Sequence, residues 1–222
     1  MTPGALIFDL NGTMIDDMAY HGHVWYDILN SLGAGLDEAQ VKAQLYGKNE
    51  ELLERVFGKG HFTHERIQEI SMEKERYYQK IFLPHLALIQ GLPELLAKAA
   101  AGNIPMAIGS AAIRFNIDFV LDNLNIRHYF KAIVSADDVA NGKPDPETFL
   151  KCAQQLGVAP ESCMVFEDAP KGVETARNAG MQSVAITTAH PAGDFAQYDN
   201  VLLFISDYTD TRLAQLFQPC KS

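Results

Sequence analysis

The chain has 222 residues, of which 47% are apolar, and its formal net charge is −10. This apolar fraction is ordinary for a globular protein and excludes a disordered chain. The sequence has no run of about eighteen uncharged apolar residues, so we expect no membrane span. The negative charge repels a polyphosphate backbone, so we expect no nucleic-acid partner. We expect the protein to be a monomer.

The cysteines indicate a reducing compartment. The chain has three, Cys152, Cys163 and Cys220, and their spacing is not that of metal ligands. The first residues run directly into an apolar segment without the basic flank of a signal peptide. We therefore expect a cytoplasmic protein.

Short apolar runs recur along the chain and have the length and composition of strands that are buried on both faces. They cover residues 5–8, 104–108, 132–134, 164–166, 183–186 and 201–205. Helical spacing is clearest over residues 93–101, 113–124, 146–156 and 172–179. Strands that alternate with helices predict an α/β fold with a Rossmann-like, doubly wound parallel sheet.

One long segment interrupts this alternation. Within residues 17–82 the pattern is helical over 23–32, 38–44, 50–57 and 66–81, with almost no strand signal. We therefore expect a helical domain of residues 16–83 inserted after the first strand. The sheet domain would then consist of residues 1–15 and 84–222. Residues 14–16 would form the outgoing hinge, and residues 83–84 and 89–91 the returning one.

Polar residues follow four of the predicted strands, and parallel sheets place ligand sites at the carboxyl ends of their strands. Asp9 ends the first strand and precedes Asn11 and Gly12. This pattern suits a simple turn, but it also suits a carboxylate nucleophile that attacks phosphorus. Ser110 follows the second strand, where it could cap a helix. Alternatively, its hydroxyl and nearby backbone N–H groups, such as that of Ala111, could bind phosphate oxygens.

The other two stretches carry charge. Lys143 lies between Gly142 and Pro144 in a rigid loop, where an ammonium could neutralise phosphoryl oxygens. Glu167 and Asp168 are adjacent at the end of a buried strand, and two such carboxylates repel each other without a partner. A hard cation such as Mg²⁺, which prefers oxygen ligands, removes that repulsion.

In this order the motifs resemble those of the haloacid dehalogenase-like superfamily, in the branch that includes β-phosphoglucomutase and many small phosphatases. FDLNGT (8–13) resembles the first motif, Ser110 the second, GKPDPETF (142–149) the third and VFEDAPKGVETARNAGM (165–181) the fourth. The helical insertion is similar to the mobile cap of these enzymes. The resemblance covers essentially the whole chain.

The resemblance implies a Mg²⁺-dependent enzyme that acts on a small phosphorylated substrate. It implies that Asp9 is the nucleophile and a metal ligand, and that Asn11 supplies a backbone carbonyl to the metal. Asp168 would be a further ligand, and Glu167 either a ligand or a more distant acceptor. It also implies that Ser110 and Lys143 hold the transferring phosphoryl group, which agrees with a transition state stabilised by positioning and fixed charge.

Asn11 departs from the family pattern, because phosphatases and mutases of this family carry a second aspartate there. That aspartate protonates the leaving oxygen and then deprotonates the attacking water, and an amide can do neither. Since such catalysis contributes about 10²–10⁴-fold, we expect severely slowed turnover with substrate binding preserved or improved. Asn11 is then either an engineered substitution or the mark of a naturally weak enzyme. We favour the first because the other catalytic positions match.

The insertion also departs from the mutase pattern. Glu50 occupies the place of an arginine that clamps a second phosphate, and Lys48 could replace it only in part. His21 matches a family histidine and could contact the acid/base site or be structural. The missing arginine weakens the mutase interpretation and favours hydrolysis of a monophosphate.

Three alternatives remain beside the phosphatase: a mutase, a phosphonate-cleaving enzyme that uses Lys48, and a catalytically silent protein that binds a phosphorylated ligand. A dehalogenase would leave the carboxylate pair Glu167–Asp168 unexplained.

Overall fold

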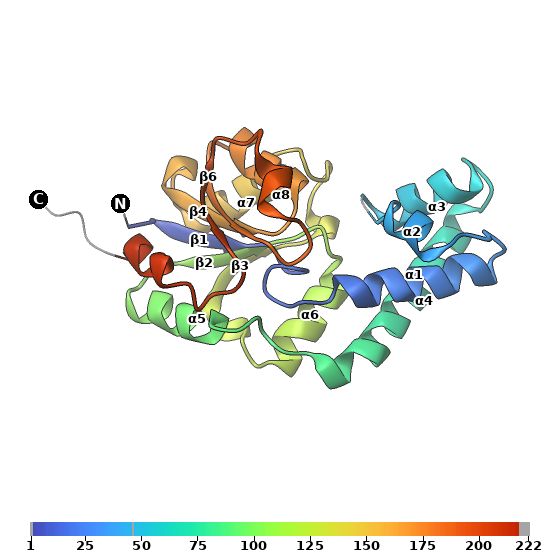
Figure 1. The fold of residues 1–222 in the computed structure, drawn as a ribbon, viewed down its shortest axis with the longest axis horizontal. Helices are drawn as coiled ribbons and strands as arrows, with labels where there is room; N and C mark the ends of the chain where they lie inside the picture. The colour runs from blue at the N-terminus through green and yellow to red at the C-terminus, as the bar shows by residue number, and fades with distance from the viewer. Residues whose placement is uncertain (1, 46, 218–222) are drawn as a thin grey trace, which may run out of the picture. The chain divides into compact units, whose positions relative to one another are not determined.

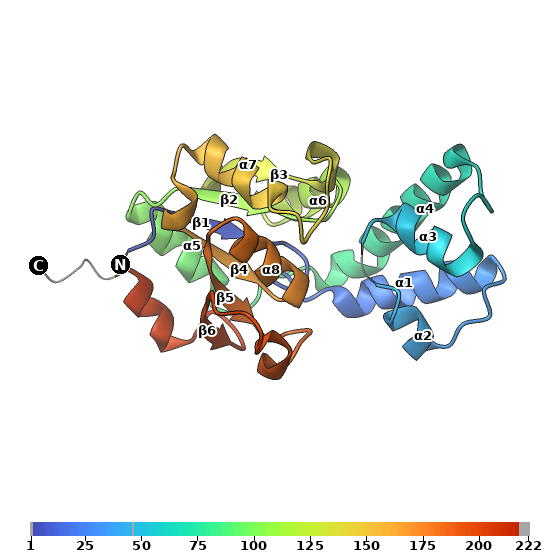
Figure 2. The same cartoon turned by 90° about the horizontal axis from the view of Figure 1, so that it is seen from above.

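The computed structural model describes residues 2–45 and 47–217, so Cys220 lies outside the described residues. The chain forms two compact units (Figures 1 and 2). The larger comprises Met1–Asp16 and Ala87–Ser222, and the smaller comprises Asp17–Leu86.

The larger unit contains a six-stranded sheet whose strands all run parallel. The strands are β1 (Ala5–Phe8), β2 (Met106–Gly109), β3 (Phe130–Val134), β4 (Cys163–Glu167), β5 (Gln182–Ile186) and β6 (Val201–Ile205). Their spatial order is β3-β2-β1-β4-β5-β6, so the direction of winding reverses between β1 and β4. This confirms the predicted doubly wound α/β fold and places its switch point beside β1.

Helices cover both faces of the sheet. They are α5 (Leu92–Ala101), α6 (Arg114–Asn123), α7 (Glu147–Leu156) and α8 (Pro170–Asn178). Figure 1 shows α7 and α8 on one face and α5 and α6 on the other. Ala5 and Ile7 point to the face of α7, where they pack with Phe149. Phe8 points to the opposite face and stacks on Phe166, with ring centroids 4.7 Å apart. Both faces of β1 are therefore buried, as its continuous apolar run requires.

The second strand begins later than its apolar run suggests. β2 starts at Met106, after Pro105, which has no N–H to donate to a neighbouring strand. The carbonyl of Pro105 still accepts a hydrogen bond from the N–H of Leu6 at 3.0 Å. At the start of the strand, Pro105 thus contributes only its carbonyl to the hydrogen bonds of the sheet.

The smaller unit is helical. Its helices are α1 (Met18–Ser31), α2 (Glu38–Lys42), α3 (Asn49–Phe57) and α4 (His64–Phe82). α1 packs against α4, and α1 begins five residues before the predicted start at residue 23. Side chains of Asp37 and Thr63 cap α2 and α4 by accepting backbone N–H bonds. Among the described residues, no helix has the length and apolar character that a membrane crossing requires.

Candidate active site

The candidate site lies at the carboxyl ends of β1, β2 and β4, which are neighbours in the sheet. Asp9 follows β1, and its N–H extends the ladder by donating to the carbonyl of Phe166 at 3.0 Å. Ser110 follows β2, and its N–H donates to the carbonyl of Val134 at 3.0 Å. The strand register thus holds both backbones at the switch point, where open α/β sheets bind ligands.

Three carboxylates meet there. Asp9, Glu167 and Asp168 are all buried, and each offers an oxygen within 4.8 Å of the other two. The ammonium of Lys143 lies 2.8 Å from Asp9 Oδ1 and 2.6 Å from Glu167 Oε1. The structure therefore brings together four of the residues predicted from the strand-end pattern.

Burial dominates the electrostatics of this cluster. It raises the pKa of Asp9 to about 6, against the lowering effect of Lys143. Burial likewise raises the pKa of Asp168 well above its ordinary value, and the charges of Glu167 and Asp9 raise it further. Burial alone would lower the pKa of Lys143, but its two carboxylate partners outweigh burial and raise it. One ammonium thus only partly compensates three carboxylates.

This donor set fits a hard divalent cation. All three side chains offer oxygen, which Mg²⁺ prefers. The charge of the ion would also relieve the carboxylate repulsion that adds to the effect of burial on the pKa values of Asp9 and Asp168. The two oxygens of Glu167 are already engaged, because Oε1 pairs with Lys143 and Oε2 accepts from the N–H of Ala169 at 2.9 Å. Asp9 and Asp168 are therefore better placed than Glu167 to bind the ion directly.

The turn after β1 is packed against Asp168. Gly12 has a φ of +73°, and a Cβ at this position would overlap a carboxylate oxygen of Asp168. The hydroxyl of Thr13 donates to Asp168 Oδ1 at 3.1 Å. Asn11 lies in the same turn and forms an isolated bridge with Ile15. Thr13 was missed at the sequence level, although it belongs to the first motif.

Two more hydroxyl groups, from residues that follow β5 and β6, also hold this turn. Thr188, after β5, donates to the carbonyl of Gly12 at 2.6 Å, and Tyr208, after β6, donates to that of Thr13 at 2.9 Å. Tyr208 is buried, and its ring also lies 5.7 Å from that of Phe166. Neither residue was predicted from the sequence, although each follows a predicted strand, which is the same signal that identified Asp9.

The loop after β2 is tied to the turn after β3. The hydroxyl of Ser110 accepts the N–H of Ala112 at 3.2 Å, and a hydrogen bond from Ser110 lowers the pKa of Asp9. Ala111, predicted to bind phosphate through its N–H, lies between them. The carbonyl of Ala112 accepts the N–H of Ala136, the first residue of the short helix η3 (Ala136–Asp138).

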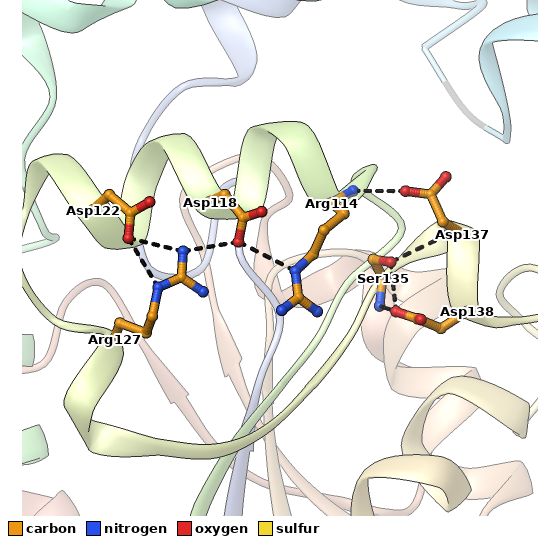
Figure 3. Close-up of polar contacts among 7 residues, drawn as sticks. All are labelled: Arg114, Asp118, Asp122, Arg127, Ser135, Asp137 and Asp138. Carbon is orange, nitrogen blue, oxygen red and sulfur yellow. Dashed lines mark hydrogen bonds and ion pairs between the residues drawn. The ribbon is translucent and has the colours of Figure 1, made fainter.

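Figure 3 shows a second link between these loops. The N–H of Arg114 donates to Asp137 Oδ2 at 2.8 Å, and Ser135 donates to Asp138 Oδ2 through both its N–H and its hydroxyl. Arg114 and Arg127, which lies beyond the end of α6, also form ion pairs with aspartates of α6. These pairs are solvent-exposed, and such pairs contribute little to stability.

His21 lies in the helical unit within a buried polar network. Its Nδ1 is 2.7 Å from Lys74 Nζ, so Nδ1 accepts, and its Nε2 is 3.3 Å from Asp17 Oδ2. Lys74 also donates to both carboxylate oxygens of Glu75, and Tyr78 donates to Asp17 while stacking on the imidazole. The network holds the ring in one orientation, and substrate binding by His21 stays a prediction.

Lys48, also in the helical unit, is exposed just before α3. Its backbone N–H donates to Glu51 Oε2 at 3.1 Å, and a role in substrate binding stays a prediction as well.

The chain is similar to known proteins in both sequence and structure. The sequence profile described as haloacid dehalogenase-like hydrolase matches residues 6–186. The fructose-1-phosphate phosphatase YqaB of Escherichia coli K12 is 34% identical over 182 residues, which are 82% of this chain and 95% of that protein. β-Phosphoglucomutase of Bacillus subtilis 168 is 34% identical over 194 residues, which are 84% of each chain.

Solved structures of haloacid dehalogenase-like proteins have the same fold as this chain. A HAD hydrolase of family IA, variant 3, from Entamoeba histolytica superposes with a TM-score of 0.86 at 26% identity, covering 97% of each chain. β-Phosphoglucomutase from Clostridium difficile superposes with a TM-score of 0.83 at 27% identity, covering 97% of this chain and 96% of that one. This chain belongs to the haloacid dehalogenase-like hydrolase family.

Proposed function

We propose that the protein is a Mg²⁺-dependent phosphatase that hydrolyses a small phosphorylated metabolite through an aspartyl-phosphate on Asp9. One observation carries the proposal: three buried carboxylates and one ammonium converge at the switch point of the sheet. Relatives named as phosphatases support the reaction class. Two buried free thiols, Cys152 and Cys163, suit the cytoplasmic location that we also propose.

Asp9 and Asp168 would hold the ion together with the backbone carbonyl of Asn11. Glu167 would act mainly by keeping Lys143 in place, because its oxygens already bind Lys143 and Ala169. When bound, magnesium would neutralise phosphate oxygens and so let the carboxylates approach the anion.

In the first step a carboxylate oxygen of Asp9 attacks phosphorus, and the bond from phosphorus to the ester oxygen breaks. The ammonium of Lys143, the hydroxyl of Ser110 and the N–H of Ala111 would balance the charge on the phosphoryl oxygens. In the second step water attacks phosphorus, the bond to Asp9 breaks, and inorganic phosphate leaves with the Asp9 carboxylate restored.

Asn11 limits both steps. An amide neither gives a proton to the leaving oxygen nor takes one from the attacking water, so solvent must do both. We therefore propose that turnover is slower than with aspartate by about 10²–10⁴-fold. A silent phospho-ligand-binding protein is the second candidate, and Asn11 is the observation that favours it.

A mutase is the third candidate, favoured by the 34% identity to β-phosphoglucomutase. Glu50 weakens this alternative, because a carboxylate at that exposed position cannot bind a second phosphate.

A phosphate-ester screen of the Asn11→Asp protein, with and without magnesium, tests the proposal. The panel includes fructose 1-phosphate, and β-glucose 1-phosphate with its bisphosphate. We expect magnesium-dependent phosphate release that exceeds the parent rate by about 10²–10⁴-fold. Asp9→Ala in the same background should abolish it. Formation of glucose 6-phosphate would identify a mutase, and inactivity across the whole panel would contradict the phosphatase and favour a binding protein.

A further inference from the structure

The lysine of the proposed phosphoryl site lies in a loop without regular secondary structure. Lys143 belongs to residues 139–146, between η3 and α7. Its Nζ must reach Asp9 and Glu167 from this loop, at 2.8 and 2.6 Å. A long side chain on an irregular segment has many positions available, so its placement depends on what holds the loop backbone.

Glu147, the first residue of α7, holds that backbone. Its Oε2 accepts the N–H of Ala140 at 3.0 Å and the N–H of Asn141 at 2.9 Å. These residues lie three and two positions before Lys143. A single carboxylate oxygen thus closes the loop onto the start of α7.

The carboxylate of Glu147 is itself held. Its Oε1 lies 2.6 Å from the Nζ of Lys151, one helical turn later. Lys151 also donates to the carbonyl of Asp138 at 2.7 Å, at the end of η3. The bond from Lys151 and the two loop N–H groups lower the pKa of Glu147 to about 2, so the carboxylate is ionised at neutral pH.

Hydrogen bonds also hold the part of the loop that follows Lys143. The N–H of Asp145 donates to the carbonyl of Gly142 at 3.0 Å, and Asp145 Oδ1 accepts the N–H of Glu147 at 3.0 Å. Asn178 of α8 donates to the carbonyl of Pro144 at 3.0 Å. Glu147 therefore takes part in the contacts on both sides of Lys143.

General helix electrostatics explains only part of this arrangement. A glutamate in the first turn of a helix suits the helix dipole, and a lysine four residues later suits the glutamate. Neither effect requires Oε2 to bind the N–H groups of Ala140 and Asn141, seven and six residues earlier in the chain. Those two bonds point to a role in the loop.

We infer that Glu147 is a positioning residue, which fixes the loop backbone so that the ammonium of Lys143 lies between Asp9 and Glu167. The inference rests on the proposed function, in which Lys143 neutralises the transferring phosphoryl group. Glu147 does not touch the reacting atoms, so it acts through Lys143.

Chemical labelling of lysines tests the placement without any need for turnover. The full chain is treated with a water-soluble acetylating reagent, and the labelling of each lysine is followed by mass spectrometry. In the parent, Lys143 is shielded and ion-paired, with its side chain 9% exposed. We expect Glu147→Ala to raise the labelling rate of Lys143 at least several-fold, while exposed Lys131 on β3 stays unchanged.

Two variants serve as controls in the labelling experiment. Glu147→Gln keeps an oxygen that can accept the loop N–H groups, so its Lys143 labelling should stay close to the parent rate. Glu161→Ala removes an exposed glutamate that precedes β4, and it should leave the labelling of Lys143 unchanged. If Glu147→Ala does not fold, Lys151→Ala removes the ion-pair partner of the same carboxylate and should raise the labelling of Lys143 to a smaller extent. Equal labelling of Lys143 in the parent and in Glu147→Ala would overturn the inference.

Kinetics tests the consequence in the Asn11→Asp background, with an ester that the screen identifies. Glu147→Ala should lower kcat/KM by about 10- to 100-fold, because misplaced catalytic groups cost rates of that order. In a Lys143→Ala background the same change should have almost no further effect, and an equal loss in both backgrounds would refute a role through Lys143. If no ester is hydrolysed, the proposed function fails while labelling still decides the placement.

Discussion

Removing the ammonium of Lys143 should destabilise the protein in a pH-dependent way. Lys143→Met deletes the charge but keeps most of the side-chain volume. The change removes contacts of 2.8 Å to Asp9 and 2.6 Å to Glu167, and all three side chains are at least nine-tenths buried. Removing one partner of a buried ion pair costs about 3–5 kcal/mol, because the remaining charge is left uncompensated. We expect a loss of that size at pH 8 in protein freed of divalent ions.

The loss should shrink as the pH falls. In the parent, the pKa of Asp9 is raised from 3.8 to about 6, so the folded state binds this proton more tightly than the unfolded state. The contribution of Asp9 to the free energy of unfolding is therefore fully present below about pH 4 and is lost as the pH rises through about 6. Without Lys143 the pKa of Asp9 rises further. At pH 5 the carboxyl is mostly protonated in the parent as well, so the difference should be smaller by about 1–2 kcal/mol.

Urea denaturation of EDTA-treated protein at pH 5 and pH 8 measures both effects. Lys131→Met, which removes an exposed lysine from β3, is the matched control and should change stability by less than about 0.5 kcal/mol. A Lys143→Met protein as stable as its parent at pH 8 would refute the reasoning. So would a loss that is larger at pH 5 than at pH 8.

Other predictions concern the same end of the sheet. Gly172→Ala should gain about 1 kcal/mol of helix propensity, but the new Cβ would displace Glu167 from Lys143 and Ala169. Urea denaturation should therefore show a net loss of about 2–4 kcal/mol in the free energy of unfolding. A stabilised variant would contradict this prediction. Gly193→Ala, where no described atom lies within 4 Å of the new Cβ, should be nearly neutral. Tyr208→Phe leaves the buried carbonyl of Thr13 without its donor and should lower the free energy of unfolding by about 1–3 kcal/mol. No change in the urea midpoint would show that water replaces the hydroxyl. Magnesium at about 100 times its Kd should raise the free energy of unfolding by about 2.7 kcal/mol, and a protein indifferent to magnesium would contradict the ion site.

The strand-end pattern was sufficient to predict much of the candidate site. Asp9, Ser110 and the pair Glu167–Asp168 each follow an apolar run, and parallel strands bring their carboxyl ends to one edge. This inference needs only local composition and the direction of the strands. Strand boundaries are harder to predict than the strands themselves because they depend on single residues. Pro105 is an example, since β2 begins only after it.

Local sequence patterns were enough to predict the parallel α/β sheet and the residues at its carboxyl edge, because burial on both faces imposes continuous apolar runs on the strands. The distant groups that hold those residues could be identified only from the folded chain. Tyr208 reaches Thr13 across 195 positions and Thr188 reaches Gly12 across 176, and such contacts depend on strand order and register. The two oxygens of Glu167 likewise bind different groups, Lys143 and the N–H of Ala169. These contacts depend on where a loop and a helix meet, which local composition does not encode.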